Sequence, residues 1–95
     1  PLTAEMAGAA GFDWVLLDYE HGPGDDSTLL HQLQAVEGTA AVPIVRIAAN
    51  ETPRFKRVLD AGAAGVMVPY VNTADEAAAA VRAMRYPPHG VRGVS

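Results

Sequence analysis

Three short apolar segments alternate along the chain with longer segments in which apolar residues recur every three or four positions. The apolar segments are "WVLLD" at 14–18, "PIVRI" at 43–47 and "GVMVP" at 65–69, and each is bounded by glycine, proline or charged residues. Each is almost continuously apolar, which is typical of parallel strands covered on both faces. The pattern therefore predicts three parallel strands.

The segments around the first strand have the spacing of amphipathic helices. Asp26 or Ser27 can cap a helix over the residues that follow, because their side-chain oxygens accept hydrogen bonds from the free N–H groups of a first turn. The apolar residues assigned to one face of this helix are Leu29, Leu30, Leu33 and Val36. A shorter helix is predicted over residues 2–10, ahead of the first strand.

Two further helices have recognisable ends. Thr52 followed by Pro53 is typical of an N-cap with proline in the first helical position. Gly62 suits the C-terminal end of that helix, because glycine readily adopts the left-handed conformation. Thr73 with Glu76 three positions later forms a capping-box pattern. These signals predict one helix after the second strand and another after the third.

The predicted order is α-β-α-β-α-β-α, which is the order of repeated βαβ units. The pentapeptide AGAAG at 7–11 and again at 61–65 lies each time between a predicted helix and a predicted strand, and we interpret it as an architectural repeat. Two α/β architectures fit this order. A doubly wound sheet usually has a glycine-rich phosphate turn, which is missing here, and a (β/α)8 barrel needs about 250 residues. In a barrel, this chain supplies about three βα units of a longer chain.

Composition narrows the classes of function. Cysteine is absent, so disulfides, thiolate nucleophiles and cysteine-based zinc sites are excluded. The formal charge of -4 has the wrong sign for general attraction to nucleic acid. No apolar run approaches the roughly 18 residues of a membrane span. We expect a cytoplasmic protein with a small-molecule ligand, without nucleic-acid or membrane partners, and we expect the chain from Pro1 to be part of a longer protein.

Ligands bind at the carboxyl ends of the strands in both parallel architectures. The first predicted strand ends in Asp18, Glu20 and His21. Histidine titrates near neutral pH and can act as a base or a metal ligand, and a neighbouring carboxylate can orient it or share a metal. A solvated loop with a capping aspartate is the alternative interpretation. The position at a strand end favours a functional site.

Arg46 is the charged residue of the second predicted strand. Burying a guanidinium is costly unless it is paired, and its shape suits a carboxylate or a developing negative charge. Alternation puts Arg46 on the same face as Ile44, so Arg46 points into the mouth of a barrel if Ile44 faces the interior. Arg46 is therefore a candidate for binding an anionic substrate. A structural ion pair with a neighbouring strand is the alternative.

Three blocks of the sequence resemble, in the same order, the metal-dependent pyruvate aldolases of the HpcH/HpaI family. They are "GFDWVLLDYEHGP" at 11–23, "VPIVRIAANETPRFKRVLDAGAAGVMVPYVNTADEA" at 42–77 and "VRAMRYPPHGVRGVS" at 81–95. The resemblance implies a (β/α)8 TIM barrel rather than a doubly wound sheet, with residues 1–95 as a fragment of a single aldolase domain. It also implies retro-aldol cleavage of 4-hydroxy-2-oxo acids to pyruvate and an aldehyde.

The resemblance also assigns roles to individual residues. It implies that His21 is the catalytic base and that Arg46 stabilises the transition state. Asp60, which by local sequence is an ordinary aspartate near a helix end, would raise the basicity of His21. Asp18 and Glu20 are secondary candidates.

A divalent cation such as Mg, Mn or Co is expected as cofactor of the full-length protein, where it would bind the carboxylate and keto oxygens of the substrate as a Lewis acid. The family's metal-binding glutamate and aspartate are expected beyond Ser95, so no metal ligand is assigned within this chain. We therefore expect the 95-residue chain alone to be inactive. The resemblance further implies a homo-oligomer, such as a hexamer.

Two other classes of function stay open at this point. A lyase of the citrate-lyase β-subunit type shares the barrel and acts on acyl-CoA thioesters, although the "EHGP" turn at 20–23 argues against it. A half-barrel can also be a non-catalytic binding or assembly module that pairs its open strand edges with another chain.

Overall fold

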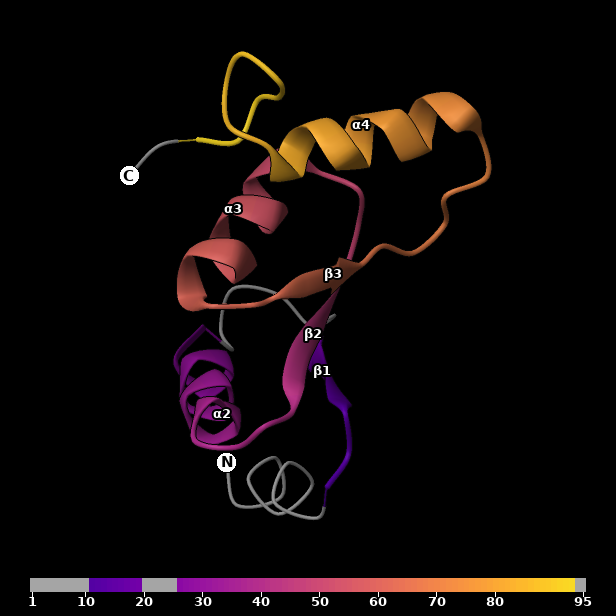
Figure 1. Ribbon diagram of the computed structural model, residues 1–95. Coiled ribbons are helices and arrows are strands. Elements are labelled where there is room, and N and C mark those ends of the chain that lie inside the picture. The colour runs from indigo at the N-terminus through magenta and orange to yellow at the C-terminus, as the bar shows by residue number, and fades with distance from the viewer. Residues whose placement is uncertain (1–10, 20–25, 94–95) are drawn as a thin grey trace.

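The computed structural model describes residues 11–19 and 26–93 (Figure 1). Strands and helices alternate in these ranges: β1 (Trp14–Tyr19), α2 (Asp26–Glu37), β2 (Val42–Ile47), α3 (Thr52–Ala61), β3 (Gly65–Met67) and α4 (Ala74–Met84). The strands form a parallel sheet in the order β1-β2-β3. This arrangement confirms the predicted series of βαβ units, while the helix predicted over residues 2–10 lies outside the described residues.

The strands begin and end close to their predicted positions. β1 extends one residue further, to Tyr19, β2 begins one residue earlier, at Val42, and β3 ends at Met67 rather than at residue 69. Asp18 of β1 is the register partner of Arg46 in β2, and Arg46 is the partner of Met67 in β3. The carboxyl ends of all three strands therefore meet at one edge of the sheet, which we call the carboxyl edge.

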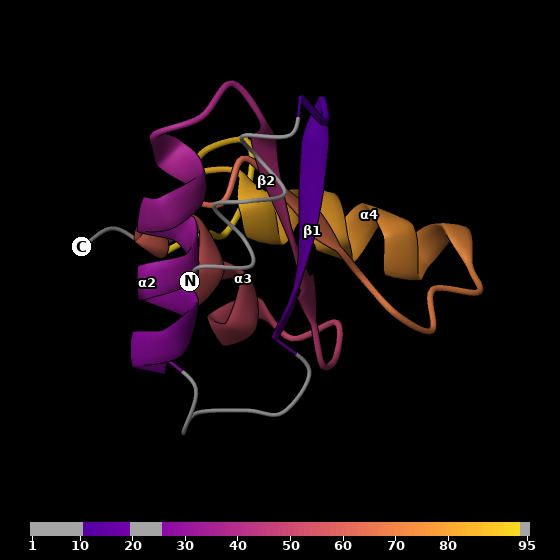
Figure 2. The ribbon, with the colours of Figure 1, turned by 90° about the horizontal axis from the view of Figure 1, so that it is seen from below.

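The hydrophobic core lies between the sheet and the helices α2 and α3, which cover the same face of the sheet (Figure 1, Figure 2). Val45 and Ile47 of β2 are fully buried there, together with Phe55 and Val58 of α3 and Val36 of α2. Burial of apolar area of this kind is the main favourable term in folding. This layer therefore holds the two helices against the sheet.

The other face of the sheet, which we call the open face, is not covered by any described residue. Ile44 on this face is partly buried, and the other apolar side chains on it are 39% to 56% exposed: Trp14, Leu16, Val42 and Met67. The described residues cover one face of the sheet, and the covering of the other face, predicted for a larger barrel, stays a prediction. The continuous apolar pattern of the strands indicates that both faces of the sheet are shielded from water, but the helices of the described residues cover only one face.

Helix α2 begins at Asp26, one or two residues earlier than a cap at Asp26 or Ser27 predicts, and buries Leu29 and Leu33 in the core. Leu30, which the pattern assigns to the same face, is 40% exposed, so that assignment is wrong. Leu30 lies about 100° around the helix from Leu29, outside the stripe that residues four positions apart share. The predicted cap by Asp26 or Ser27 depends on side chains that lie outside the described set.

Helix α3 differs from the prediction at its beginning and agrees with it at its end. Glu51 occupies the N-cap position with no side-chain cap, and Pro53 lies in the first turn, so the prediction of Thr52 as the cap is wrong. Proline is tolerated there because the first N–H groups of a helix have no partner inside it. Gly62 has a φ of 120° and its N–H donates to the carbonyl of Leu59 at 3.1 Å, which confirms the predicted end.

Helix α4 is capped as predicted, because the hydroxyl of Thr73 accepts the N–H of Glu76 at 3.1 Å. Its buried residues are Ala80 and Ala83 in its second half, which packs on α3, whereas its first half extends away from the sheet (Figure 2). Among the helices of the described ranges, none has the length and apolar character needed to cross a membrane.

Candidate functional site

Asp18 and Arg46 lie next to each other at the carboxyl edge of the sheet. Both point to the open face, because their neighbours Leu17 and Val45 point into the core. The guanidinium of Arg46 donates from Nη2 to Oδ2 of Asp18, and from Nε to Oδ1 at 3.4 Å. A contact through two donors orients the plane of the guanidinium at the strand end.

The surroundings of this pair leave it accessible. The side chains of Arg46 and Asp18 are 36% and 45% exposed. An ion pair exposed to this degree typically adds only about 0–1 kcal/mol to stability, because water and salt screen it. The structure confirms that Arg46 is paired with a neighbouring strand, and the binding of an anionic ligand by Arg46 stays a prediction.

Glu20 and His21 lie outside the described residues. In the sequence they follow Tyr19, the last residue of β1. The role of His21 as base and the secondary role of Glu20 therefore stay predictions.

Tyr19 belongs to the core rather than to the open face. It is 4% exposed and packs in the same cluster as Leu17. Its hydroxyl is buried without a hydrogen-bond partner among the described residues. Tyr19 therefore does not line the surface on which Arg46 is presented.

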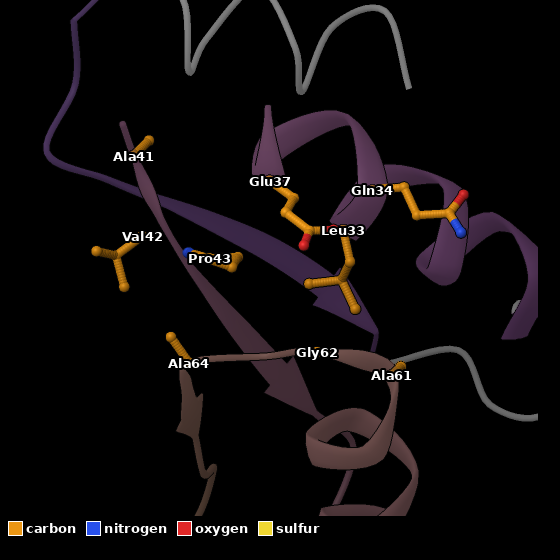
Figure 3. A pocket seen from close by; sticks show the side chains of 9 residues that line it. All are labelled: Leu33, Gln34, Glu37, Ala41, Val42, Pro43, Ala61, Gly62 and Ala64. Atoms are coloured by element: carbon orange, nitrogen blue, oxygen red, sulfur yellow. The ribbon is translucent and has the colours of Figure 1, made fainter. Parts of the chain in front are cut away.

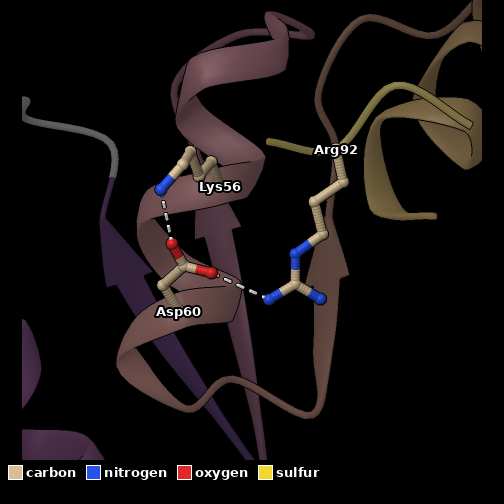
Figure 4. A network of polar contacts seen from close by, with 3 residues as sticks. All are labelled: Lys56, Asp60 and Arg92. Atoms are coloured by element: carbon tan, nitrogen blue, oxygen red, sulfur yellow. Dashed lines mark hydrogen bonds and ion pairs between the residues drawn. The ribbon is translucent and has the colours of Figure 1, made fainter. Parts of the chain in front are cut away.

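Asp60 lies in the last turn of α3, where the chain has returned toward the start of β3. Its Oδ2 accepts from Nζ of Lys56 at 2.8 Å, and its Oδ1 accepts from Nη2 of Arg92 at 2.9 Å (Figure 4). The guanidinium of Arg92 also lies 4.4 Å from the centre of the Tyr86 ring, which is a cation–π distance. We call Lys56, Asp60, Arg92 and Tyr86 the α3 network.

The described residues do not bring Asp60 to the Asp18–Arg46 pair. Arg46 is the last residue but one of β2 at the carboxyl edge, whereas α3 carries the chain from that edge back to the amino end of β3. The role of Asp60 toward His21 stays a prediction. Sequence reasoning missed Arg92 as its partner, and the only local signal is an arginine between the closely spaced glycines of "GVRG" at 90–93.

A pocket opens at the amino ends of the strands, between the last turns of α2, the start of β2 and the turn from α3 to β3 (Figure 3). Gln34 and Glu37 are its polar side chains on α2, and the rest of its lining is mostly small or apolar. Ligands of parallel α/β folds bind at the carboxyl ends of the strands instead. The pocket is therefore not the candidate site.

Within residues 11–19 and 26–93, no group of three or more histidine, aspartate or glutamate side chains could hold a metal ion. Among the described residues of the three strands, Asp18 is the carboxylate at the carboxyl edge, and it is engaged by Arg46. These residues do not by themselves fit the divalent cation expected from the sequence. An ion bound in the full-length protein would need other ligands.

Comparison with known proteins was made on the whole chain. The model of the HpcH/HpaI aldolase/citrate lyase family matches residues 1–95. Over all 95 residues the chain is 53% identical to the 5-keto-4-deoxy-D-glucarate aldolase of Salmonella paratyphi A. The matched residues make up 37% of that relative, so the chain spans well under half the length of the curated relatives it matches.

Solved structures agree with this match. An HpcH/HpaI aldolase/citrate lyase family protein from Burkholderia cenocepacia superposes with a TM-score of 0.90 at 42% identity, over 99% of this chain and 39% of that protein. The citrate synthase SbnG gives a TM-score of 0.89 at 38% identity, over 99% of this chain and 38% of that one. The fold is therefore part of a TIM-barrel-like aldolase fold, as the sequence predicted.

Proposed function

This chain belongs to the HpcH/HpaI aldolase/citrate lyase family, and from that premise we propose that the full-length protein cleaves a 4-hydroxy-2-oxo acid into pyruvate and an aldehyde. The observation that carries the proposal is the position of Arg46, a guanidinium at the carboxyl edge that is open to an anion. Similarity to 5-keto-4-deoxy-D-glucarate aldolase supports a keto-deoxy sugar acid as the substrate.

In the proposed reaction, His21 accepts the proton of the C4 hydroxyl as the bond between C3 and C4 breaks. The electron pair of that bond passes to the three-carbon fragment, which leaves as the enolate of pyruvate and takes up a proton. Arg46 holds the oxo acid and offsets the negative charge that develops on it. A divalent cation with ligands elsewhere in the full-length chain is part of this proposal and would supply Lewis-acid chemistry.

Asp18 and Asp60 have supporting parts in the proposal. Asp18 orients the guanidinium of Arg46 through their two-point contact. Asp60 would raise the basicity of His21, which requires the assembled protein to bring the two residues within reach. A homo-oligomer, such as a hexamer, is proposed for the same reason.

A second candidate is the cleavage or formation of a carbon–carbon bond in an acyl-CoA thioester instead of an oxo acid. Structural similarity to the citrate synthase SbnG supports this second candidate. The two candidates differ in the size of the substrate that the active site must hold, because a thioester carries a large nucleotide group and a sugar acid does not. Product analysis separates them directly.

The test measures pyruvate release by full-length protein from 5-keto-4-deoxy-D-glucarate, with lactate dehydrogenase and NADH as the coupled readout. His21→Ala should lower kcat about 100-fold or more, whereas the Kd of pyruvate, measured by calorimetry, should change far less. His31→Ala is the matched control, because His31 is exposed on α2.

Two results would contradict the proposal. Equal loss of rate and of pyruvate binding in the His21→Ala protein would argue against its role as base. Cleavage of a malyl or citramalyl thioester, with no pyruvate from the oxo acid, would favour the second candidate.

A further inference from the structure

Tyr70 is the one non-glycine residue of the described ranges with a positive φ, which is 58°. This left-handed conformation is unfavourable for a residue with a Cβ, because the Cβ crowds the following carbonyl oxygen. Such conformations persist only where the surrounding structure imposes them, and they cluster at functional sites. The positive φ of Tyr70 therefore raises two questions: which contacts hold the residue in place, and what function its side chain has.

Hydrogen bonds hold the part of the segment between β3 and α4 that follows Tyr70. Asn72 donates from its backbone N–H to Oε1 of Glu76 at 3.0 Å, and from Nδ2 to the carbonyl of Tyr70 at 3.4 Å. Thr73 accepts the N–H of Glu76, and Asn50, from the segment after β2, donates to the carbonyl of Glu76 at 3.0 Å. These bonds tie the segment after β2 to the start of α4 and restrain the backbone that follows Tyr70.

Tyr70 lies near Arg46 in the fold. Met67 is the register partner of Arg46, and Tyr70 follows Met67 by three residues. With strands about 4.8 Å apart and at most about 3.6 Å of chain per residue, the two Cα atoms lie within roughly 16 Å of each other. Both side chains extend several ångströms from their Cα atoms. A substrate held by its oxo acid end at Arg46 can therefore reach Tyr70 with its other end.

Packing does not explain the conformation of Tyr70. Its residue exposure is 80%, the highest among the large apolar and aromatic residues exposed in the described ranges. Tyr19, by contrast, is a buried tyrosine of the same sheet with ordinary strand conformation. The ring and the hydroxyl of Tyr70 are thus presented at the carboxyl edge instead of being used in the core.

We propose that Tyr70 is a specificity-determining residue that recognises the aldehyde half of the substrate, with its phenol hydroxyl hydrogen-bonded to a hydroxyl group of a hydroxylated aldehyde. This inference rests on the proposed aldolase function. A phenol both donates to and accepts from an alcohol. A site that hydrogen-bonds a substrate hydroxyl discriminates against an analogue without it. Arg46 then selects the oxo acid half, and Tyr70 selects the other half.

The test uses the full-length protein in the direction of aldol addition, with pyruvate and one of two aldehydes of similar size. Glycolaldehyde ends in a hydroxyl group and propionaldehyde in a methyl group. Tyr70→Phe should lower kcat/KM for glycolaldehyde about tenfold and leave kcat/KM for propionaldehyde within about twofold, because it removes one hydrogen bond. Tyr86→Phe is the matched control, because it removes a hydroxyl from a tyrosine that stacks on Arg92, and it should leave both values unchanged.

Tyr70→Gly is a second variant that separates specificity from backbone strain. Glycine accepts a φ of 58°, so this protein should melt at the same or a higher temperature and yet lose the preference for glycolaldehyde. Equal losses toward both aldehydes, or an unchanged preference in both variants, would overturn the inference. A wild-type protein that adds pyruvate to neither aldehyde would overturn the proposed function and this inference with it, and that failure is seen before any variant is compared.

Discussion

Two arginine–aspartate pairs of this protein have the same chemistry and opposite surroundings. Arg46 meets Asp18 on the open face of the sheet, where both side chains are more than a third exposed. Arg92 meets Asp60 beside α3, and its side chain is only 16% exposed and stacks on Tyr86. The first pair is more open to solvent, whereas the second is partly enclosed by the fold.

The backbone explains why the second pair is enclosed. The segment after α4 folds back on the helix, with hydrogen bonds from Val91 to Arg82 at 2.8 Å and from Arg92 to Arg85 at 2.9 Å. Gly90 makes this possible, because a Cβ there would lie 2.2 Å from the carbonyl oxygen of Arg82. The fold therefore delivers Arg92 to Asp60, while Arg46 projects from a strand onto a face that no described residue covers.

The largest effect is expected at Arg46. Arg46→Lys keeps the positive charge but loses the planar fork, so kcat/KM for cleavage of the oxo acid should fall about 100-fold or more in the full-length protein. Its free energy of unfolding should change by less than about 1 kcal/mol, because the pair with Asp18 is exposed. Steady-state kinetics and urea unfolding measure the two quantities. A large loss of stability with little loss of activity would remove the distinction between the two pairs.

The reverse outcome is expected at Arg92. Arg92→Met removes a mostly buried charge and leaves Asp60 with one fewer cation, so the free energy of unfolding should fall by about 1–2 kcal/mol. Arg85→Met, at an exposed residue of the same segment, is the control and should change it by less than about 0.5 kcal/mol. Chemical unfolding of the full-length proteins gives these values. Stability equal to the wild type would show that the α3 network contributes nothing to the fold.

The smallest effect is expected at the cap of α4. Thr73→Ala should cost about 1 kcal/mol of unfolding free energy at neutral pH, because it removes the acceptor for the N–H of Glu76. The hydrogen bond from the backbone of Asn72, and after it the one from the side chain of Thr73, lower the pKa of Glu76. The stability that these bonds add to the folded protein is complete above the ordinary pKa of a glutamate, and it is lost as the pH falls through the lowered pKa.

Unfolding measured at a series of pH values checks this cap. The difference between wild type and Thr73→Ala should shrink below the ordinary pKa of a glutamate. A difference in unfolding free energy that grows toward acid pH would contradict the inference that Thr73 stabilises the charged form of Glu76. Thr73→Ala should change the preference between the two aldehydes much less than Tyr70→Phe does.

The features that could be predicted from the sequence are those with a local or periodic cause. The strands follow from continuous apolar runs, Gly62 from the needs of a helix end, and Thr73 from the spacing of a capping box. Arg46 could be placed at a strand end, and its pairing with a neighbouring strand was one of the two interpretations. Asp18 lies 28 residues away in the sequence, but the regular register of parallel strands brings it to Arg46.

Other features depended on the tertiary structure, because their cause is a contact between segments without a shared pattern. Leu30 is exposed since α2 presents a narrower stripe to the sheet than its leucines suggest. Arg92 reaches Asp60 across 32 residues from a segment without periodicity, so no local rule relates them. Tyr70 adopts a conformation that its own side chain disfavours, and the segment that follows it is held by hydrogen bonds from Asn72 and from Asn50. Interactions between residues close in the sequence determine where the helices and strands form. Contacts between distant segments determine which charged and aromatic side chains stay exposed.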